Sequence, residues 1–144
     1  VLCNIFTIRS ARLRLVMLRS KVLIVDDDDA FRQAISIFLR EQFSIEIREA
    51  SNYQEALQQL DGLDLVFVDI SLPGENGLDL TAKLKSEHPE IVVSILTIHD
   101  SPEYRDAAFE QGADYFVSKG APAEKILEVV QSVVARTQPN RMPF

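Results

Sequence analysis

The sequence predicts an open, doubly wound α/β domain, in which helices cover both faces of a parallel sheet. Short apolar segments alternate with segments of helical periodicity, which is typical of parallel strands joined by crossover helices. The apolar segments are nearly continuous rather than alternating, as expected of strands buried on both faces. The pattern extends over residues 21–136, which is enough for one domain with one hydrophobic core.

Five segments have the composition of strands. Residues 22–25, 65–68 and 91–96 are almost continuously apolar, which predicts three buried strands. Residues 44–49 alternate between polar and apolar side chains, which predicts a strand with one exposed face. A fifth strand is predicted over residues 113–117.

Each strand is followed by a segment with helical signals. Apolar residues recur at helical spacing from Phe31 to Leu39. Residues 51–54 match a capping box, which predicts a helix that continues to Leu60. Turn residues precede the third helix, a proline occupies the first position of the fourth, and Pro122 opens the fifth. The predicted helices cover residues 31–39, 51–60, 78–87, 101–111 and 122–136.

Composition excludes several classes of protein. A single cysteine, Cys3, rules out an internal disulfide framework and a cysteine-based zinc site. No run of 18 uncharged apolar residues is present, so no membrane span is predicted. The formal net charge of −7 argues against a nucleic-acid-binding surface.

The charge is unevenly distributed along the chain. Residues 1–21 carry five basic residues and no acidic one, which leaves 10 basic and 22 acidic residues in the remainder. We interpret residues 1–20 as a basic extension outside the fold and residues 137–144 as the start of a linker. A secretory signal peptide fits less well because arginines interrupt the apolar residues, while a basic amphipathic segment that contacts a membrane or a partner stays an alternative.

Polar residues stand at the carboxyl ends of four predicted strands. Asp26 and Asp27 follow the first, Asp69 the third, Thr97 the fourth and Lys119 the fifth. Because the carboxyl ends of parallel strands meet at one edge of the sheet, where such folds bind ligands, these side chains are expected to converge. By contrast, Asp28 and Asp29 are interpreted as a solvated acidic cap on the first helix.

Three converging carboxylates repel one another unless a cation joins them. Oxygen ligands of this type suit Mg²⁺, which is typically held by one or two carboxylates together with waters. A Mg²⁺ site beside a lysine has the groups that phosphoryl transfer needs. Asp69 is the candidate nucleophile, because a carboxylate can carry a phosphoryl group as an aspartyl phosphate.

Four segments carry a family resemblance through their order and spacing: Val22–Asp27, Asp64–Asp69 with Pro73 and Gly77 after it, Ser94–Thr97 and Gly112–Lys119. With them, residues 21–136 resemble the receiver domains of two-component response regulators. The resemblance implies a flavodoxin-like sheet of five parallel strands in the order 2-1-3-4-5 with five helices. Residues 72–77, 96–104 and 119–122 look like receivers that precede a LuxR-type helix-turn-helix output domain.

The resemblance also implies roles for individual residues. Mg²⁺ would be held by the carboxylates of Asp26, Asp27 and Asp69 and by the backbone carbonyl of Ser71. Asp69 would accept a phosphoryl group from the phosphohistidine of a histidine kinase or phosphotransfer protein, or from a small phosphodonor. Lys119 would pair with one phosphoryl oxygen, and Thr97 would move to hydrogen-bond another. Phe116 occupies the place of the switch aromatic.

Two further residues occupy positions that flank the attacking water in receivers. Ser71 and His99 stand two residues beyond Asp69 and Thr97, where they would tune dephosphorylation. His99 can equally be read as a solvated loop histidine.

The implied function is a cytoplasmic signalling switch rather than an enzyme with an external substrate. Phosphorylation would change the surface made by residues 101–111, 113–117 and 122–136, which would then pair with a second copy or contact an output domain. No output domain is visible in this chain, so it is either a free-standing receiver or a longer transcription regulator cut at its linker.

Three other functions stay open at this point. A phosphatase of the haloacid-dehalogenase type would need an aspartate two residues after its nucleophile, where this chain has Ser71. A pseudo-receiver would act only as a binding module, without phosphorylation. A flavodoxin-like cofactor binder would need a phosphate-cradling loop after the first strand, where the run of four aspartates would repel phosphate.

Overall fold

The structure, a computed structural model, describes residues 19–137, and it confirms the predicted fold class and strand order. Most of the predicted extension and nearly all of the predicted linker lie outside this range. Five parallel strands form one sheet in the order β2-β1-β3-β4-β5. The strands are β1 (Lys21–Val25), β2 (Glu46–Ala50), β3 (Leu65–Val68), β4 (Val92–Thr97) and β5 (Tyr115–Ser118), and the helices are α2 (Asp29–Gln42), α3 (Tyr53–Leu57), α4 (Gly77–Glu87), α5 (Pro102–Glu110) and α6 (Glu124–Thr137).

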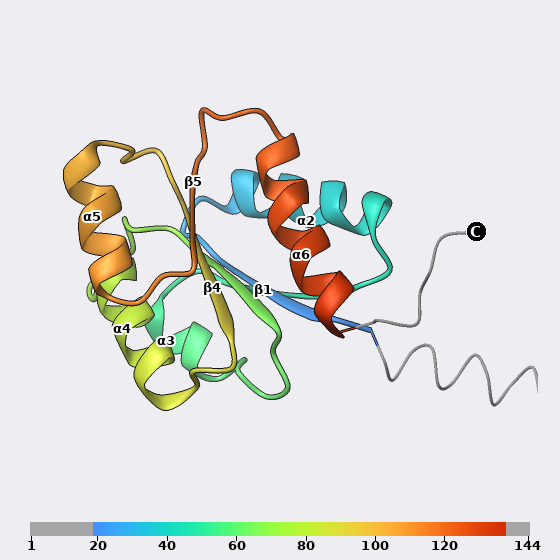
Figure 1. Cartoon of the computed structure of the whole chain (residues 1–144), viewed down its shortest axis with the longest axis horizontal. Helices are drawn as coiled ribbons and strands as arrows, with labels where there is room; N and C mark the ends of the chain where they lie inside the picture. Colours follow the sequence, from blue (N-terminus) through green and yellow to red (C-terminus); the bar gives the residue numbers. More distant parts are fainter. Residues whose placement is uncertain (1–18, 138–144) are drawn as a thin grey trace, which may run out of the picture.

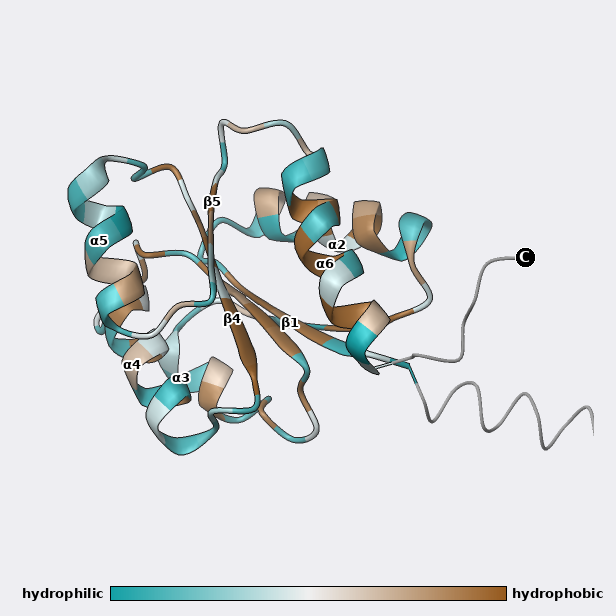
Figure 2. Ribbon diagram, in the orientation of Figure 1, coloured by the Kyte–Doolittle hydropathy of each residue, from teal (hydrophilic) through white to brown (hydrophobic). Residues whose placement is uncertain are grey.

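The helices form two layers around the sheet (Figure 1). α2 and α6 pack on one face through a core that includes Leu39 and Val130. α3, α4 and α5 pack on the other face through a core that includes Leu80 and Ala108. Figure 2 shows hydrophobic strands at the centre of the molecule and helices that carry both hydrophilic and hydrophobic residues. Burial on both faces explains why the central strands are nearly continuous apolar segments.

The strand order places the candidate site at the centre of the sheet. β1 pairs with β3 in a register that sets Val25 opposite Val68, so Asp26 and Asp69 leave neighbouring strands at the same level. The backbone N–H of Asp69 donates to the carbonyl of Val25 at 3.0 Å. A helix connects each strand to the next by crossing back over the sheet, so all strands run in the same direction. The ends of β1 and β3 therefore lie at one edge of the sheet, with the two aspartates side by side.

The predicted helix at residues 51–60 is twice as long as the helix in the structure. α3 covers only Tyr53–Leu57, and Asn52 rather than Ser51 caps it by accepting from the N–H of Glu55. The backbone beyond Leu57 turns more tightly, with the N–H of Gln59 donating to the carbonyl three residues before it. Nη1 of Arg48 in β2 donates to the backbone carbonyl of Gln59 at 2.8 Å. This contact with the sheet stabilises the turn in place of a further turn of helix.

The two ends of the described fold meet. Ser20 is buried, and its hydroxyl forms a hydrogen bond with that of Thr137, the last residue of α6. Both residues lie one position beyond the predicted limits of the domain. Among residues 19–137, no helix has the length and apolar character needed to cross a membrane.

Candidate functional site

Three carboxylates meet at the carboxyl ends of β1 and β3. One oxygen each from Asp26, Asp27 and Asp69 lies within 4.8 Å of the others. Asp26 and Asp69 are buried, with 2% and 5% of their surface exposed, whereas Asp27 is exposed to solvent. The site is therefore a shallow acidic cluster with two fixed carboxylates at its base and one at its mouth.

The Lys119 side chain bridges the two buried carboxylates. Its Nζ lies 2.7 Å from Oδ2 of Asp26 and 3.1 Å from Oδ2 of Asp69. The backbone places the lysine, because the N–H of Lys119 donates to the carbonyl of Thr97 just past the end of β5. The ammonium also lies 4.2 Å from the centre of the Phe31 ring, a distance at which the ring face attracts a cation.

The protonation equilibria of this group follow from burial and pairing. Burial has the largest effect on Asp26 and raises the pKa of its carboxyl, against the lowering by hydrogen bonds from Lys119 and the Asp28 N–H. The Asp69 charge raises it further. For Lys119, burial favours the neutral amine, but the hydrogen bonds and charges of Asp26 and Asp69 outweigh it and raise the pKa of the ammonium. The contacts with both carboxylates thus favour the charged form of the lysine.

The donor set fits a hard divalent cation. It consists of three carboxylates, and the exposed one stands at the side from which solvent reaches the cluster. Oxygen ligands of this charge and number suit Mg²⁺. Asp69 also accepts the N–H of Ser71 at 3.3 Å, so the loop after β3 folds back toward the carboxylate.

The loop from Ile70 to Asn76 returns against Asp69. The N–H of Gly77 donates to the carbonyl of Ile70 at 2.9 Å. A Cβ atom at residue 77 would lie 2.0 Å from the backbone oxygen of Asp69, so only glycine fits at this approach. The first turn of α4 therefore packs directly on the backbone that carries Asp69.

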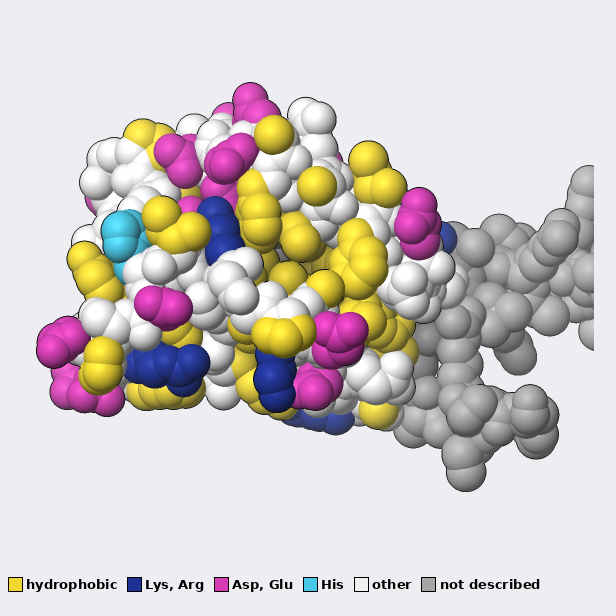
Figure 3. Space-filling model, turned by 90° about the horizontal axis from the view of Figure 1, so that it is seen from above, with side chains coloured by type: hydrophobic (Ala, Val, Ile, Leu, Met, Phe, Trp, Pro, Cys, Tyr) yellow, Lys and Arg dark blue, Asp and Glu magenta, His cyan; other side chains and the backbone are white. Residues whose placement is uncertain are grey.

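Thr97, at the end of β4, is fully buried, and its Oγ1 accepts the N–H of His99 at 3.2 Å. Nε2 of His99 lies 2.6 Å from Oγ of Ser71, and its ring packs against Tyr104 with the centroids 5.1 Å apart. His99 is thus tied to the loop after β3 rather than free in solvent. Figure 3 shows the face above the strand ends, where acidic, basic, apolar and histidine side chains lie close together.

Phe116 lies on β5, three residues before the lysine. It is partly buried and packs against the core under α3, α4 and α5. The guanidinium of Arg105 from α5 covers its ring at 4.8 Å from the centroid. The aromatic side chain therefore sits between the core and a basic residue of the outer helix.

Sequence reasoning overlooked Phe31 and Arg32, two site neighbours on α2. Arg32 occurs on the buried stripe of the helix with Ser36 and Leu39, at spacings of four and seven residues. A charged residue on such a stripe is a signal that could have been read, because it must find buried partners. Asp28 caps the helix as interpreted, by accepting the N–H of Phe31 at 3.1 Å.

Comparison with known proteins agrees with this geometry. Residues 22–131 match the family model of the response regulator receiver domain. The transcriptional regulatory protein SrrA of Staphylococcus aureus is 37% identical over 122 residues, which are 83% of this chain and 49% of that protein. A cyclic di-GMP phosphodiesterase of Thermotoga maritima is 36% identical over 98 residues, which are 68% of this chain and 26% of that protein. The chain thus spans half or less of these relatives' lengths.

Solved structures show the same similarity. A receiver domain of DrrB activated with BeF3 has a TM-score of 0.75 at 26% identity, over 82% of this chain and 99% of that one. A DNA-binding response regulator of the LuxR family from Staphylococcus aureus has a TM-score of 0.73 at 26% identity, over 79% of this chain and 98% of that one. With the family model matched over most of its length, the chain belongs to the response regulator receiver domains of two-component signalling.

Proposed function

We propose that this domain is a phosphorylation-controlled switch in which Asp69 accepts a phosphoryl group from a histidine kinase, a phosphotransfer protein or a small phosphodonor. One observation carries the proposal: the buried Asp69 carboxylate shares the Lys119 ammonium with Asp26, beside the exposed Asp27. Receiver domains act in signalling rather than as enzymes with an external substrate.

The chemistry follows from the residues present. An oxygen of Asp69 forms the new P–O bond while the P–N bond to the donor histidine breaks, and Lys119 balances charge on a phosphoryl oxygen. Asp26, Asp27, Asp69 and the backbone carbonyl of Ser71 would hold Mg²⁺. When bound, the ion neutralises the charge that develops on the transferred group. Burial keeps the Asp26 and Asp69 side chains in place, and the exposed Asp27 leaves the site open to a donor.

The proposal is tested by incubating the domain with acetyl phosphate and Mg²⁺ and measuring the intact mass. One phosphoryl group should be added, it should be lost in hydroxylamine as an acyl phosphate is, and chelation of Mg²⁺ should prevent the addition. In a separate melting experiment, Mg²⁺ at a hundred times its dissociation constant should stabilise the fold by about 2.7 kcal/mol. A domain that gains no mass and melts unchanged in Mg²⁺ contradicts the proposal.

We further propose that Ser71 and His99 tune the lifetime of the phosphorylated state. Their 2.6 Å contact joins the loops after β3 and β4, and the Ser71 N–H donates to Asp69, so the pair would restrict the approach of an attacking water to the phosphorylated carboxylate. Ser71→Ala is expected to shorten the half-life about fivefold, which corresponds to one neutral hydrogen bond of about 1 kcal/mol. His99→Ala should have the same effect, and the double variant should add nothing to either change. Unchanged half-lives in both single variants would remove this role.

We propose that a movement of Thr97 on phosphorylation is coupled to a movement of the Phe116 side chain. The Thr97 hydroxyl accepts the His99 N–H, which leaves its own hydrogen available for a phosphoryl oxygen. Movement of Thr97 toward that oxygen would free space beside β5, into which Phe116 could turn from under Arg105. Two such discrete packings are what a population shift requires.

Thr97→Ala is therefore expected to accept phosphate at Asp69 yet lose the response of α5, β5 and α6. The measurement is the set of amide chemical shifts with beryllofluoride and Mg²⁺. Thr97→Ser keeps the hydroxyl and should respond as the wild type does. Wild-type shifts that change around Asp69 but not on this face would contradict the coupling.

The face made by α5, β5 and α6 is also the proposed contact for a second copy or an output domain. Similar proteins include transcriptional regulators and a LuxR-family DNA-binding regulator, which supports a DNA-binding output in the whole protein. The proposal places the domain in the cytoplasm, where a kinase has ATP. A change in sedimentation on addition of beryllofluoride would test dimer formation, and an unchanged monomer would exclude it.

A further inference from the structure

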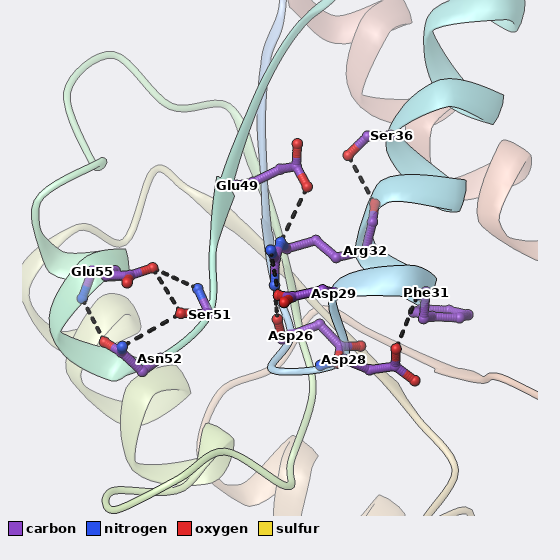
Figure 4. A network of polar contacts seen from close by, with 10 residues as sticks. All are labelled: Asp26, Asp28, Asp29, Phe31, Arg32, Ser36, Glu49, Ser51, Asn52 and Glu55. Atoms are coloured by element: carbon purple, nitrogen blue, oxygen red, sulfur yellow. Dashed lines mark hydrogen bonds and ion pairs between the residues drawn. The ribbon is translucent and has the colours of Figure 1, made fainter.

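One arginine lies behind the acidic cluster and contacts three elements at once (Figure 4). Nη1 of Arg32 donates to the backbone carbonyl of Asp26 at 2.6 Å, and Nε donates to Oε1 of Glu49 at 3.1 Å. Nη2 lies 2.7 Å from Oδ1 of Asp29, and 12% of the arginine side chain is exposed. A single guanidinium thus joins the residue after β1, the end of β2 and the first turn of α2.

The contact with the carbonyl completes the hydrogen bonding of Asp26. The N–H of Asp26 donates to the carbonyl of Ala50 at 3.0 Å. Its Oδ1 accepts the N–H of Asp28 at 2.9 Å, and its Oδ2 contacts Lys119. The carbonyl that Arg32 holds belongs to the planar peptide group between Asp26 and Asp27. Arg32 therefore holds the backbone unit from which both carboxylates extend.

We infer that Arg32 is a positioning residue of the phosphorylation site, which holds the Asp26–Asp27 peptide so that both carboxylates face Asp69. The inference rests on the proposed function, since it names what prepares that site for a cation. Arg32 binds the backbone and not the carboxylates of the cluster, so it leaves their oxygens available.

The chemistry of the side chain suits this role. A guanidinium presents its donors on three nitrogens in a rigid planar fork, whereas a lysine carries its three donors on a single nitrogen at the end of a flexible stem. A lysine at this position therefore cannot reproduce the spacing of the three contacts that Nε, Nη1 and Nη2 of Arg32 make. Burial favours the neutral form of Arg32, but hydrogen bonds and charges from Asp29 and Glu49 outweigh it and raise its pKa. The side chain is thus a fixed cation that two carboxylates outside the cluster already balance.

The test compares Arg32→Lys with a matched control, Arg48→Lys. Arg48 of β2 is also partly buried, pairs with Glu46 and donates to two backbone carbonyls, but its acceptors lie in the turns after α3 rather than at the site. Titration calorimetry of the metal-free domain with Mg²⁺ should show the dissociation constant raised about tenfold in Arg32→Lys, as for other residues that orient metal ligands. Labelling by acetyl phosphate should slow at low Mg²⁺ and recover at saturation. Arg48→Lys should bind Mg²⁺ as the wild type does.

The outcomes separate this inference from the proposed function. Arg32→Lys with wild-type affinity for Mg²⁺ overturns the inference, and so does an equal loss of affinity in Arg48→Lys. A wild-type domain that neither binds Mg²⁺ nor gains a phosphoryl group overturns the proposed function instead. If circular dichroism shows that Arg32→Lys does not fold, the Mg²⁺ affinities of Glu49→Ala and Glu49→Gln test the inference instead. The alanine removes the acceptor of Nε and should raise the dissociation constant about threefold above that of the glutamine variant, which keeps an acceptor. Equal affinities in this pair would overturn the inference.

Discussion

Asp69→Asn is expected to abolish phosphorylation by acetyl phosphate completely. An amide oxygen does not form an acyl phosphate, and the neighbouring Asp26 and Asp27 are expected to act as metal ligands rather than as acceptors. The fold should persist because Lys119 keeps its 2.7 Å contact with Asp26. The stability of the domain should change little, because the substitution removes both the repulsion between Asp69 and Asp26 and the attraction between Asp69 and Lys119.

The measurement is the intact mass after incubation, combined with urea denaturation of the unlabelled protein. Asp79→Asn is the matched control, because Asp79 is exposed on α4 and does not belong to the cluster, so the variant should label as the wild type does. An Asp69→Asn variant that still gains a phosphoryl group would show that another residue is the acceptor.

Gly77→Ala is expected to destabilise the domain by about 3 kcal/mol, at the upper end for an added methyl group in a packed interior. The new Cβ would lie 2.0 Å from the oxygen and 2.8 Å from the carbonyl carbon of Asp69. Both are backbone atoms, so no side-chain rotation relieves the contact. The loop between β3 and α4 must move, and it carries Asp69 with it, so labelling should also slow severely.

Gly120→Ala provides the comparison at the same edge of the sheet. Its added Cβ would meet only Oγ of Ser118, at an ordinary 3.6 Å, so stability and labelling should stay close to those of the wild type. Urea denaturation of the two variants measures the difference directly. If Gly77→Ala unfolds within about 1 kcal/mol of Gly120→Ala, the close approach at Asp69 is not a constraint on the fold.

Local pattern was enough to predict the architecture and the residues at the strand ends. A strand buried on both faces is a short apolar segment whatever it packs against, so its end can be read from the first polar residue, as at Asp26 and Asp69. Parallel strands then bring these ends to one edge. The alternation of strands and helices therefore located the acidic cluster and Lys119 without any knowledge of distances.

The tertiary structure alone decided which groups touch around that cluster. Ser71 and His99 are 28 residues apart, and only the paths of two loops bring them to 2.6 Å. Arg32 donates to the backbone carbonyl of Asp26, and every residue has such a carbonyl. The identity of residue 26 therefore does not predict this contact. The same reason explains the early end of α3, where Arg48 of β2 donates to the backbone carbonyl of Gln59 in the turn that follows the helix. Side-chain periodicity records which face of an element is buried, whereas contacts to the backbone and between loops depend on the packed fold.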